Sequence, residues 1–554
     1  MYLNELDNFH FDLPSLGTAP QVAVPNEAPD ELDLSALPLP TTLAVPSGEA
    51  GVPGGGGEVL PEGSVEDYPQ IGSLSPADTE LFKGVIAKYF VEDISSYEAP
   101  SRVVPSHAST EEGGDDVEPE KKNCLLKDNG FGIGIPETEI VKNLQYEEAD
   151  TVNTTEIRKQ FPILHQKVNG HDLVWFDNGA TTQKPLRVID GLSHFYKTDY
   201  SNIHRGAHTL AARSTDQYEA AREKVARFIN APAKENILFV RGTTEGINLV
   251  AQTYGRQFLT PGDDVIVSEL DHHANIVPWQ RVAQEKGATL RAIPTDQNGD
   301  LILSEFERII TPRTRFVSVG HVNNTFGTIN DVQRIIEIAH SHNIPVLIDG
   351  AQSIAHTPVD VQALGADFFV FSGHKIYGPN GIGVVYGRKE LLDKMQPWQG
   401  GGNMIKDVTI ERTEYNVPPA RFEAGTPNVA DAIGLGAALD YVSHLGIRNI
   451  EHHEHQLTEY AREQLAQIPG LTLIGNPKNR VSVVSFVLDG IPVPETGTLL
   501  DKEGIAVRAG HHCAQPALRA LGYEMSVRPT FALYNTREDV DKLVIAIRKI
   551  VGQK

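Results

Sequence analysis

The stretch RAGHHCAQP, residues 508–516, places one of the two cysteines of the chain directly after two histidines. Cys513 could be a metal ligand, a buried apolar residue or a nucleophile. A zinc site needs further cysteines or histidines at ligand spacing, and the other cysteine, Cys124, lies in an N-terminal region of different composition. No metal site is therefore expected, and the polar flanks of Cys513 are unusual for a core segment.

Further polar residues follow short apolar runs that are typical of buried strands. Lys375 comes after DFFVF and the turn SGH, and Asp349 ends the run IPVLID. Thr243 and Thr244 open a helical stretch after NILFV, and His272 follows DDVIVSEL. A single lysine beyond a strand is usually a solvated residue. Here an acid, an imidazole and two hydroxyl groups are expected at the same edge of a sheet.

Together these residue types match the needs of pyridoxal 5′-phosphate (PLP). Backbone N–H groups at the helix start near Thr243, with the side chains of Ser372 and His374, could bind its phosphate. Lys375 could carry the aldehyde as a Schiff base, Asp349 could keep the pyridine nitrogen protonated, and a histidine could stack on the ring. A dinucleotide cofactor is the rival, but no G-x-G-x-x-G follows these strands.

The elements that must position these residues alternate from about residue 154 onward. Apolar runs are each followed by a polar loop and a helical stretch, as in DDVIVS followed by ELDHHANIVPWQRVAQEKG. Such alternation predicts an α/β fold with a mostly parallel sheet covered by helices on both faces. Ligands bind beyond the carboxyl ends of the strands in such sheets, and the polar loops begin there.

Residues 1–150 differ in composition from the rest of the chain. They hold 29 acidic and 7 basic residues, which is most of the net charge of −25, and 15 of the 35 prolines. Low hydrophobicity and acidic excess predict a largely disordered extension. Short apolar segments at 9–17, 32–40 and 130–140, and a capped amphipathic helix predicted over 75–93, favour binding of a partner protein over a passive linker.

Composition also limits where the protein acts. Two cysteines in 554 residues argue against a disulfide framework and indicate a reducing compartment. No apolar run reaches the roughly 20 residues of a membrane span, and the first residues lack the pattern of a signal peptide. No strongly basic segment suits nucleic acid. We therefore expect a soluble cytoplasmic protein that binds neither membranes nor nucleic acid.

Six segments resemble those of the group II, SufS-type cysteine desulfurases: RGTTEGINLVA, DHHANIVPWQ, VLIDGAQS, FSGHKIYGPNGIG, RFEAGTPN and RAGHHCA. The resemblance begins near residue 155 and does not cover residues 1–150. It implies the fold-type I architecture of PLP-dependent transferases and a homodimer. A large PLP-binding domain would span residues 151–410, and a smaller C-terminal α/β domain with the cysteine loop would span residues 411–554.

The resemblance also implies a role for each candidate residue. Lys375 would bind PLP and then move the substrate Cα proton, and Cys513 would be the nucleophile. The other expected cofactor contacts are Asp349 at the pyridine nitrogen, Gln352 at the ring oxygen, His272 stacked on the ring and able to shuttle protons, and Thr243, Thr244, Ser372, His374 and the second subunit's Thr426 at the phosphate. The expected substrate contacts are Arg528 at the carboxylate, Asn324 nearby, and Arg508 and His204 lining the site.

The implied reaction converts L-cysteine to L-alanine and leaves a persulfide on Cys513. Only a thiolate attacks sulfur in this way, and Arg508, His511 or His512 could favour the anion. A selenocysteine lyase is the alternative on the same fold. The extension resembles that of desulfurases packaged in encapsulin shells, which implies sulfur storage in a nanocompartment. Delivery through a SufE-like acceptor to Fe–S cluster assembly is the alternative destination.

Overall fold

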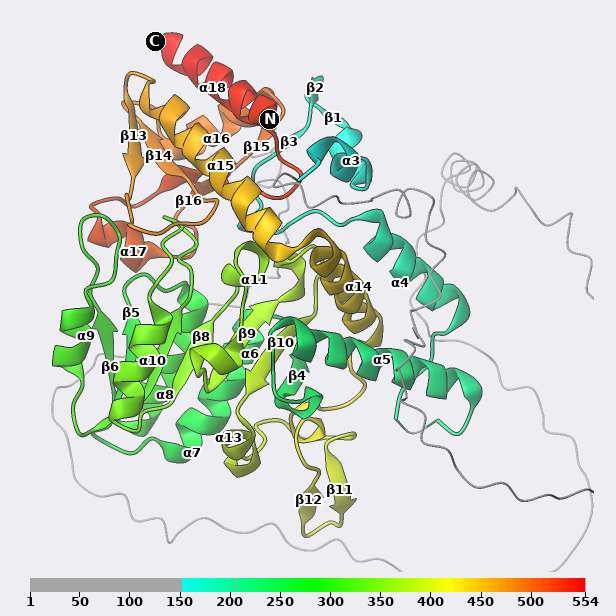
Figure 1. The fold of residues 1–554 in the computed structure, drawn as a ribbon. Coiled ribbons are helices and arrows are strands. Elements are labelled where there is room, and N and C mark those ends of the chain that lie inside the picture. Colours follow the sequence, from blue (N-terminus) through cyan, green and yellow to red (C-terminus); the bar gives the residue numbers. More distant parts are fainter. Residues whose placement is uncertain (1–151, 205, 554) are drawn as a thin grey trace, which may run out of the picture. The chain divides into compact units, whose positions relative to one another are not determined.

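The computed structural model describes residues 152–204 and 206–553 (Figure 1). The predicted extension 1–150, with its apolar segments and the helix predicted over 75–93, lies outside these residues. Among the described helices, none has both the length and the apolar composition that crossing a membrane requires.

The largest sheet has seven strands. In spatial order they are β4 (Ile237–Val240), β10 (Gly383–Gly387), β9 (Phe368–Ser372), β8 (Val346–Asp349), β7 (Thr314–Gly320), β5 (Asp264–Ser268) and β6 (Thr289–Ile293). Strand β10 runs antiparallel to both of its neighbours, and all the other strands share one direction. The mostly parallel sheet is thus confirmed, and the carboxyl ends of its parallel strands meet at one edge.

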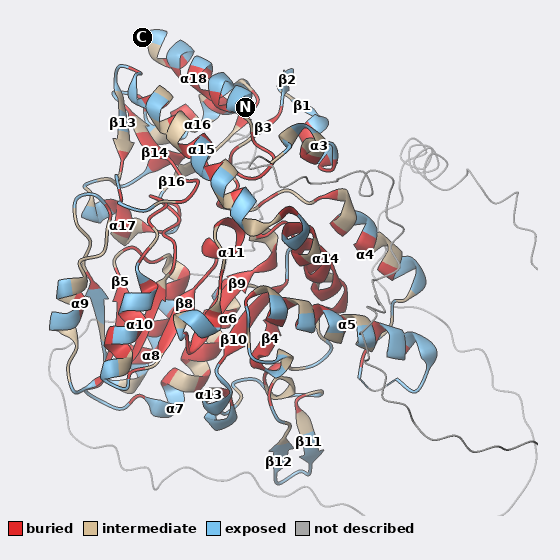
Figure 2. Cartoon of the chain, in the orientation of Figure 1, coloured by how far each residue is buried: buried red, intermediate tan, exposed pale blue. Residues whose placement is uncertain are grey.

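Both faces of the inner strands of this sheet are buried, as the red strands in Figure 2 show, whereas the edge strand β6 is mostly exposed. Side chains alternate along each strand, so neighbouring residues enter different apolar clusters. In β8, Val346 and Ile348 share a cluster with residues of α5 (Thr209–Phe228), α10 (Val332–Ser341) and α14 (Val429–Leu445). Leu347 belongs to the cluster formed with α6 (Thr243–Val250) and α8 (Val277–Lys286). The predicted cover of helices on both faces is confirmed.

A second sheet is antiparallel and four-stranded. Its order is β13 (Leu471–Ile474), β14 (Ser485–Leu488), β17 (Ser526–Arg528) and β16 (Arg508–Gly510). It shares a core with α15 (Ile447–Ala466), α16 (Val493–Lys502) and α18 (Arg537–Gly552). Helix α18 begins with a reciprocal capping box between Thr536 and Asp539.

The start of the described chain joins this second core. Strand β3 (Val174–Trp175) pairs in parallel with β15 (Ile505–Ala506), and Val174 is buried among residues of the C-terminal core. Helix α14, by contrast, shares its cluster with the large sheet. The domain boundaries 151–410 and 411–554 stay a prediction.

The remaining elements connect these layers, and one of them, α11 (Ser353–His356), is wholly buried. Their helices are α3 (Thr154–Lys159), α4 (Leu186–Thr198), α7 (Arg256–Phe258), α9 (Leu303–Ile309), α11, α12 (Val361–Leu364), α13 (Lys389–Lys394) and α17 (Gln515–Ala520). Their strands form the pairs β1 (Lys167–Val168) with β2 (His171–Asp172), and β11 (Ile405–Val408) with β12 (Thr413–Tyr415).

Candidate active site

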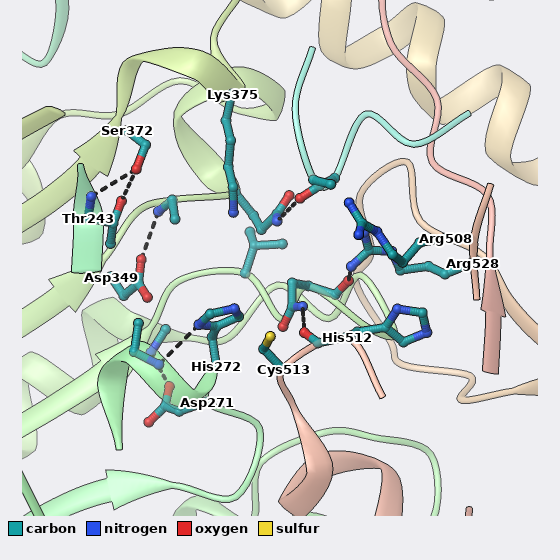
Figure 3. Close-up of a pocket in the computed structure, with 18 of the residues that line it drawn as sticks. Thr243, Asp271, His272, Asp349, Ser372, Lys375, Arg508, His512, Cys513 and Arg528 are labelled. Carbon is teal, nitrogen blue, oxygen red and sulfur yellow. Dashed lines mark hydrogen bonds between the residues drawn. The ribbon is translucent and has the colours of Figure 1, made fainter. Parts of the chain in front are cut away.

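A cavity of about 580 Å³ lies at the carboxyl edge of the large sheet, between this edge and the loop that carries Cys513 (Figure 3). Most of the predicted site residues line it, although they come from distant parts of the chain. These residues are Thr243, Thr244, His272, Asn324, Asp349, Gln352, Ser372, His374, Lys375, Arg508, Cys513 and Arg528.

One end of the cavity is built around the first turn of α6. The Thr243 backbone N–H donates to Ser372 Oγ at 2.8 Å, and Thr243 Oγ1 lies 2.8 Å from the same oxygen. A Cβ added at Gly383 of β10 would lie 2.4 Å from Gly242 Cα, so the loop before α6 sits directly on the strand. The free N–H groups and positive dipole end of α6, beside these hydroxyl groups, suit a phosphate.

Lys375 and Asp349 enter the cavity from neighbouring strand ends, β9 and β8. Burial lowers the pKa of Lys375 to about 8, against the opposing effect of the Asp349 carboxylate. Burial raises the pKa of Asp349, while the Ala351 N–H at 2.9 Å from its Oδ1 and the charge of Lys375 lower it. A buried carboxylate can pair with a cationic ring nitrogen. An amine that is readily neutral can react with an aldehyde.

His272 is held as a neutral imidazole. Its Nδ1 accepts the Ala274 N–H at 3.0 Å, so the ring proton resides on Nε2. Burial lowers the pKa of His272 to about 3, and the charge of Lys375 lowers it further. A neutral, half-buried ring at this edge of the cavity can pack against an aromatic cofactor.

Asp271 is a cavity residue that the sequence analysis missed. Its two oxygens accept the N–H groups of Ser268 and Gly320, each at 2.7 Å, and thereby join the ends of β5 and β7. Burial raises the pKa of Asp271 to about 7. Its position beside the predicted His272, directly after an apolar run, was the available signal.

Gln352 and His374 fasten the cavity wall to the segment that follows β3. Gln352 Nε2 donates to the Gly179 carbonyl at 2.8 Å. The His374 carbonyl accepts the N–H of Thr182 at 3.1 Å and the Lys184 ammonium at 3.2 Å. Burial lowers the pKa of His374 to about 4, so its ring is neutral near pH 7.

The opposite end of the cavity carries two arginines from the smaller sheet. Arg528 is buried, and its Nη1 donates to the Asn324 carbonyl at 2.7 Å. Arg508 is half-exposed and forms an ion pair with Asp177, with Nη2 2.8 Å from Oδ2. Asp177 was not predicted. The signal for it was an acidic residue directly after the apolar run LVWF.

The loop that bears Cys513 is fixed by its backbone. His512 and Cys513 both have a φ of +54°, and the Cys513 carbonyl accepts the His273 N–H at 2.7 Å. Asn324 Nδ2 donates to the His512 carbonyl at 2.8 Å. The Cys513 side chain itself is exposed. Burial lowers the pKa of His512 to about 2, so its ring is neutral near pH 7. The cations whose charges interact with Cys513 are Lys375 and Arg528.

Two predicted residues lie outside this cavity. His204 contacts Glu219, with Nε2 3.4 Å from Oε1, and this hydrogen bond raises the pKa of His204. Thr426 lines another cavity, of about 460 Å³, together with Trp398 and Glu423. The assignment of Thr426 to a second subunit's site stays a prediction.

The cavity meets the requirements of PLP on its own geometry. At one end are the hydroxyl groups and helix terminus for a phosphate, and between the ends are Lys375 and Asp349. At the far end, Asn324 Oδ1 and Arg528 Nε are buried without a hydrogen-bond partner among the described residues. Buried polar atoms without a partner favour binding of a polar ligand. An amino acid, with its carboxylate and ammonium groups, would be such a ligand.

Comparisons with known proteins agree with this geometry. The family model described as aminotransferase class-V matches residues 174–543. A probable cysteine desulfurase of Mycolicibacterium paratuberculosis is 58% identical over 404 residues, which are 73% of this chain and 59% of the relative. A cysteine desulfurase of Synechococcus elongatus is 57% identical over 395 residues, 71% of this chain and 63% of the relative. The chain thus spans less than two thirds of both relatives.

A solved structure shows the same fold. The crystal structure of the cysteine desulfurase CsdA, in an S-sulfonic acid form, from Escherichia coli superposes with a TM-score of 0.68 at 43% identity. The match covers 72% of this chain and 99% of that chain. The predicted fold-type I architecture is confirmed by this neighbour.

Proposed function

This chain belongs to the class-V aminotransferase family, and we propose that it is a PLP-dependent cysteine desulfurase of the group II, SufS type. The proposed reaction converts L-cysteine to L-alanine. The observation that carries the proposal is the convergence of an amine, a buried arginine and a thiol, those of Lys375, Arg528 and Cys513, on one cavity.

The cofactor would be held along the sheet edge. The first turn of α6, with Thr243, Thr244, Ser372 and His374, would bind the phosphate. Asp349 would face the ring nitrogen, Gln352 the ring oxygen, His272 the ring face and Lys375 the aldehyde. When bound, PLP withdraws electrons from the substrate Cα and makes its proton acidic.

The protein side chains would then carry out three tasks. Arg528, with Asn324 beside it, binds the substrate carboxylate and so orients the amino acid. Lys375, with its pKa of about 8, is partly neutral near pH 7.5 and can accept the Cα proton. A pKa close to the working pH suits Lys375, because its amine must both take up and return a proton.

Cys513 would accept the sulfur. Its thiolate attacks the substrate sulfur atom, the new S–S bond forms as the Cβ–S bond breaks, and the electron pair stays with the substrate carbon. Protonation of that carbon skeleton gives L-alanine. The exposed position of Cys513 at the cavity lets a persulfide reach an external acceptor.

Substitution of the two cysteines tests this function. C513A should keep its PLP and its affinity for L-cysteine but lose production of alanine and sulfide by on the order of a hundredfold or more, because no thiolate remains at the cavity. C124A, which removes the other cysteine, is the matched control and should retain activity. Undiminished turnover in C513A would move the nucleophile elsewhere. The same assay with L-selenocysteine decides the selenocysteine lyase alternative.

We further propose that the active form is a homodimer. Thr426 and His204 lie away from the cavity of their own chain, and the predicted role of Thr426 requires a second subunit. Sedimentation of the holoenzyme should give a dimer. Mixing inactive K375A and T426A chains should restore activity if each site uses both subunits, and no restoration would argue against sharing.

We propose that residues 1–150 direct a cytoplasmic protein into an encapsulin shell for sulfur storage. Their acidic excess and short apolar segments support this role. A chain lacking residues 1–150 should keep its turnover but no longer co-purify with a co-expressed shell protein. Retained packaging would refute the targeting role. Stimulation of sulfide release by a SufE-like protein would instead support delivery to Fe–S assembly.

A further inference from the structure

A second cavity, of about 410 Å³, is lined by the first half of α15, the end of α11 and residues 480–482, which precede β14. Helix α11 packs against α15, as Figure 1 shows. The cavity shares no lining residue with the active-site cavity. Its volume falls within the range of about 300–1,000 Å³ that is usual for small-molecule sites. The proposed reaction uses none of the side chains that line it.

One of the lining side chains is a buried carboxylate. Glu454 is 2% exposed, and its Oε2 lies 2.6 Å from His356 Nδ1. Ser482 Oγ donates to the same oxygen at 3.3 Å. The other oxygen, Oε1, is buried without a hydrogen-bond partner among the described residues. Buried polar atoms are nearly always paired, so Oε1 favours a ligand that donates a hydrogen bond.

The charge of Glu454 favours a cationic donor. Burial raises the pKa of Glu454, whereas His356 and Ser482 lower it. A positive charge bound at Oε1 would oppose the effect of burial and keep the carboxylate ionised. An ammonium group therefore suits this oxygen better than a hydroxyl group, because it brings a charge together with its N–H donors.

An unpaired cation lines the same cavity. Arg448 is exposed in the first turn of α15, and its guanidinium makes neither an ion pair nor a hydrogen bond with the described residues. Arg480 is engaged, because its Nη2 donates to Asn476 Oδ1 and to the Pro477 carbonyl, each at 3.0 Å. A free guanidinium suits a carboxylate, which can accept two of its N–H groups.

The cavity also has an apolar part. Ile329 and Val481 line it and belong to a small apolar cluster with Val322 and Val483. Three histidines line the cavity as well, but no three His, Cys, Asp or Glu side chains within the described part of the chain could hold a metal ion. The lining therefore suits an organic molecule with an ammonium group, a carboxylate and an apolar side chain.

We propose that this cavity is a second ligand site, which binds a free α-amino acid with an apolar side chain. The ammonium group contacts Glu454, and the carboxylate contacts Arg448. The apolar side chain lies against Ile329 and Val481. The inference does not rest on the proposed function, because the two cavities have no lining residue in common.

L-Leucine is the probe, and isothermal titration calorimetry measures its dissociation constant. The holoenzyme is first treated with borohydride, which reduces the bond between Lys375 and PLP, so that leucine cannot displace the lysine. Leucine should bind the wild-type chain. R448M and E454Q should each raise Kd by at least about tenfold, because each removes one charge-assisted contact. N-Acetyl-L-leucine, without the ammonium group, and L-leucinamide, without the carboxylate, should bind at least about tenfold more weakly than L-leucine.

Two control variants separate these contacts from general charge effects. E451Q removes another carboxylate that lines the cavity, and R227M removes an exposed arginine of α5. Both should leave Kd unchanged. E454Q alters a buried contact with His356, whereas Arg448 is exposed, so R448M tests the site in a chain whose core is untouched. R448M should also desulfurate L-cysteine at the wild-type rate.

Separate outcomes refute the inference and the proposed function. Equal leucine binding by wild-type, R448M and E454Q chains would place the bound amino acid elsewhere and refute the second site. A loss in E451Q with none in E454Q would refute the contact assigned to Glu454. Inorganic phosphate that binds in an Arg448-dependent way, without leucine binding, would show an anion site and overturn the amino acid. Leucine binding that R448M abolishes, in a protein that produces no sulfide, would refute only the proposed function.

Discussion

The pKa of Lys375 predicts how fast the apoprotein takes up its cofactor at each pH. Burial lowers this pKa from 10.5 to about 8, and only the neutral amine attacks an aldehyde. At pH 7.5 about a quarter of the Lys375 side chains are then neutral, whereas about one in a thousand is neutral for an ordinary lysine. PLP uptake should therefore be about 240-fold faster than with an exposed lysine.

The direction of the pH dependence follows from the same shift. Since the pKa of Lys375 is lowered, deprotonation of its amine has its midpoint near pH 8 and is complete well below pH 10.5. Stopped-flow absorbance of apoprotein mixed with PLP should therefore give a rate that levels off above about pH 9. The apoprotein should also gain stability between pH 8 and 10.5, where the unfolded lysine still binds a proton that the folded one has released.

Three variants make this prediction refutable. D349N should lower the midpoint further, because the Asp349 carboxylate raises the pKa of Lys375. K184M removes another lysine whose pKa burial lowers to about 8, and it should leave the midpoint unchanged. K375A should abolish covalent uptake. A midpoint near pH 10 in the wild type, or borohydride labelling of a different lysine, would refute the argument.

Two predictions concern the framework of the site. G383A places a methyl group 2.4 Å from Gly242 Cα, so it should lower the melting temperature and the PLP affinity. Nothing lies within 4 Å of a Cβ at Gly400, so the control G400A should change neither. R222M breaks the buried Arg222–Glu423 pair, in which Nη1 and Oε1 are 2.6 Å apart. Leaving that carboxylate unpaired should cost about 3–5 kcal/mol of unfolding free energy by denaturant titration. R256M, at the exposed pair with Glu285, should have hardly any effect, and an R222M protein as stable as R256M would contradict the reasoning.

The part of the site built on the large sheet could be predicted from sequence, because the alternation of strands and helices that makes strands parallel can be recognised from neighbouring segments. A helix separates most of the apolar runs, which makes their strands parallel, so the polar residues after them must meet at the carboxyl edge. Thr243, Asp349, Ser372 and Lys375 lie there as expected. No comparable rule applies to Arg528, which sits within β17 of the smaller sheet and reaches the cavity only through packing of two sheets.

Carboxylates that act inside the protein were the residues most easily missed. Asp271 binds two backbone N–H groups and Asp177 binds two arginines, yet in sequence both look like polar residues at the end of an apolar run. Gly320 and the two arginines come from segments far along the chain, and Ser268 is the one of these partners that is close in sequence. For Thr426 and His204 the sequence analysis went too far for a single chain. The resemblance assigned both residues to the active site, but neither lines the cavity of its own chain.

The most direct test of the central claim is the covalent state of Cys513 after the holoenzyme is mixed with L-cysteine. Peptide mass spectrometry under non-reducing conditions, with an alkylating trap, should find one added sulfur atom on the peptide containing Cys513, in step with L-alanine release. The Cys124 peptide should remain unmodified. L-Alanine formed at the full rate while the Cys513 peptide carries no added sulfur would contradict the account.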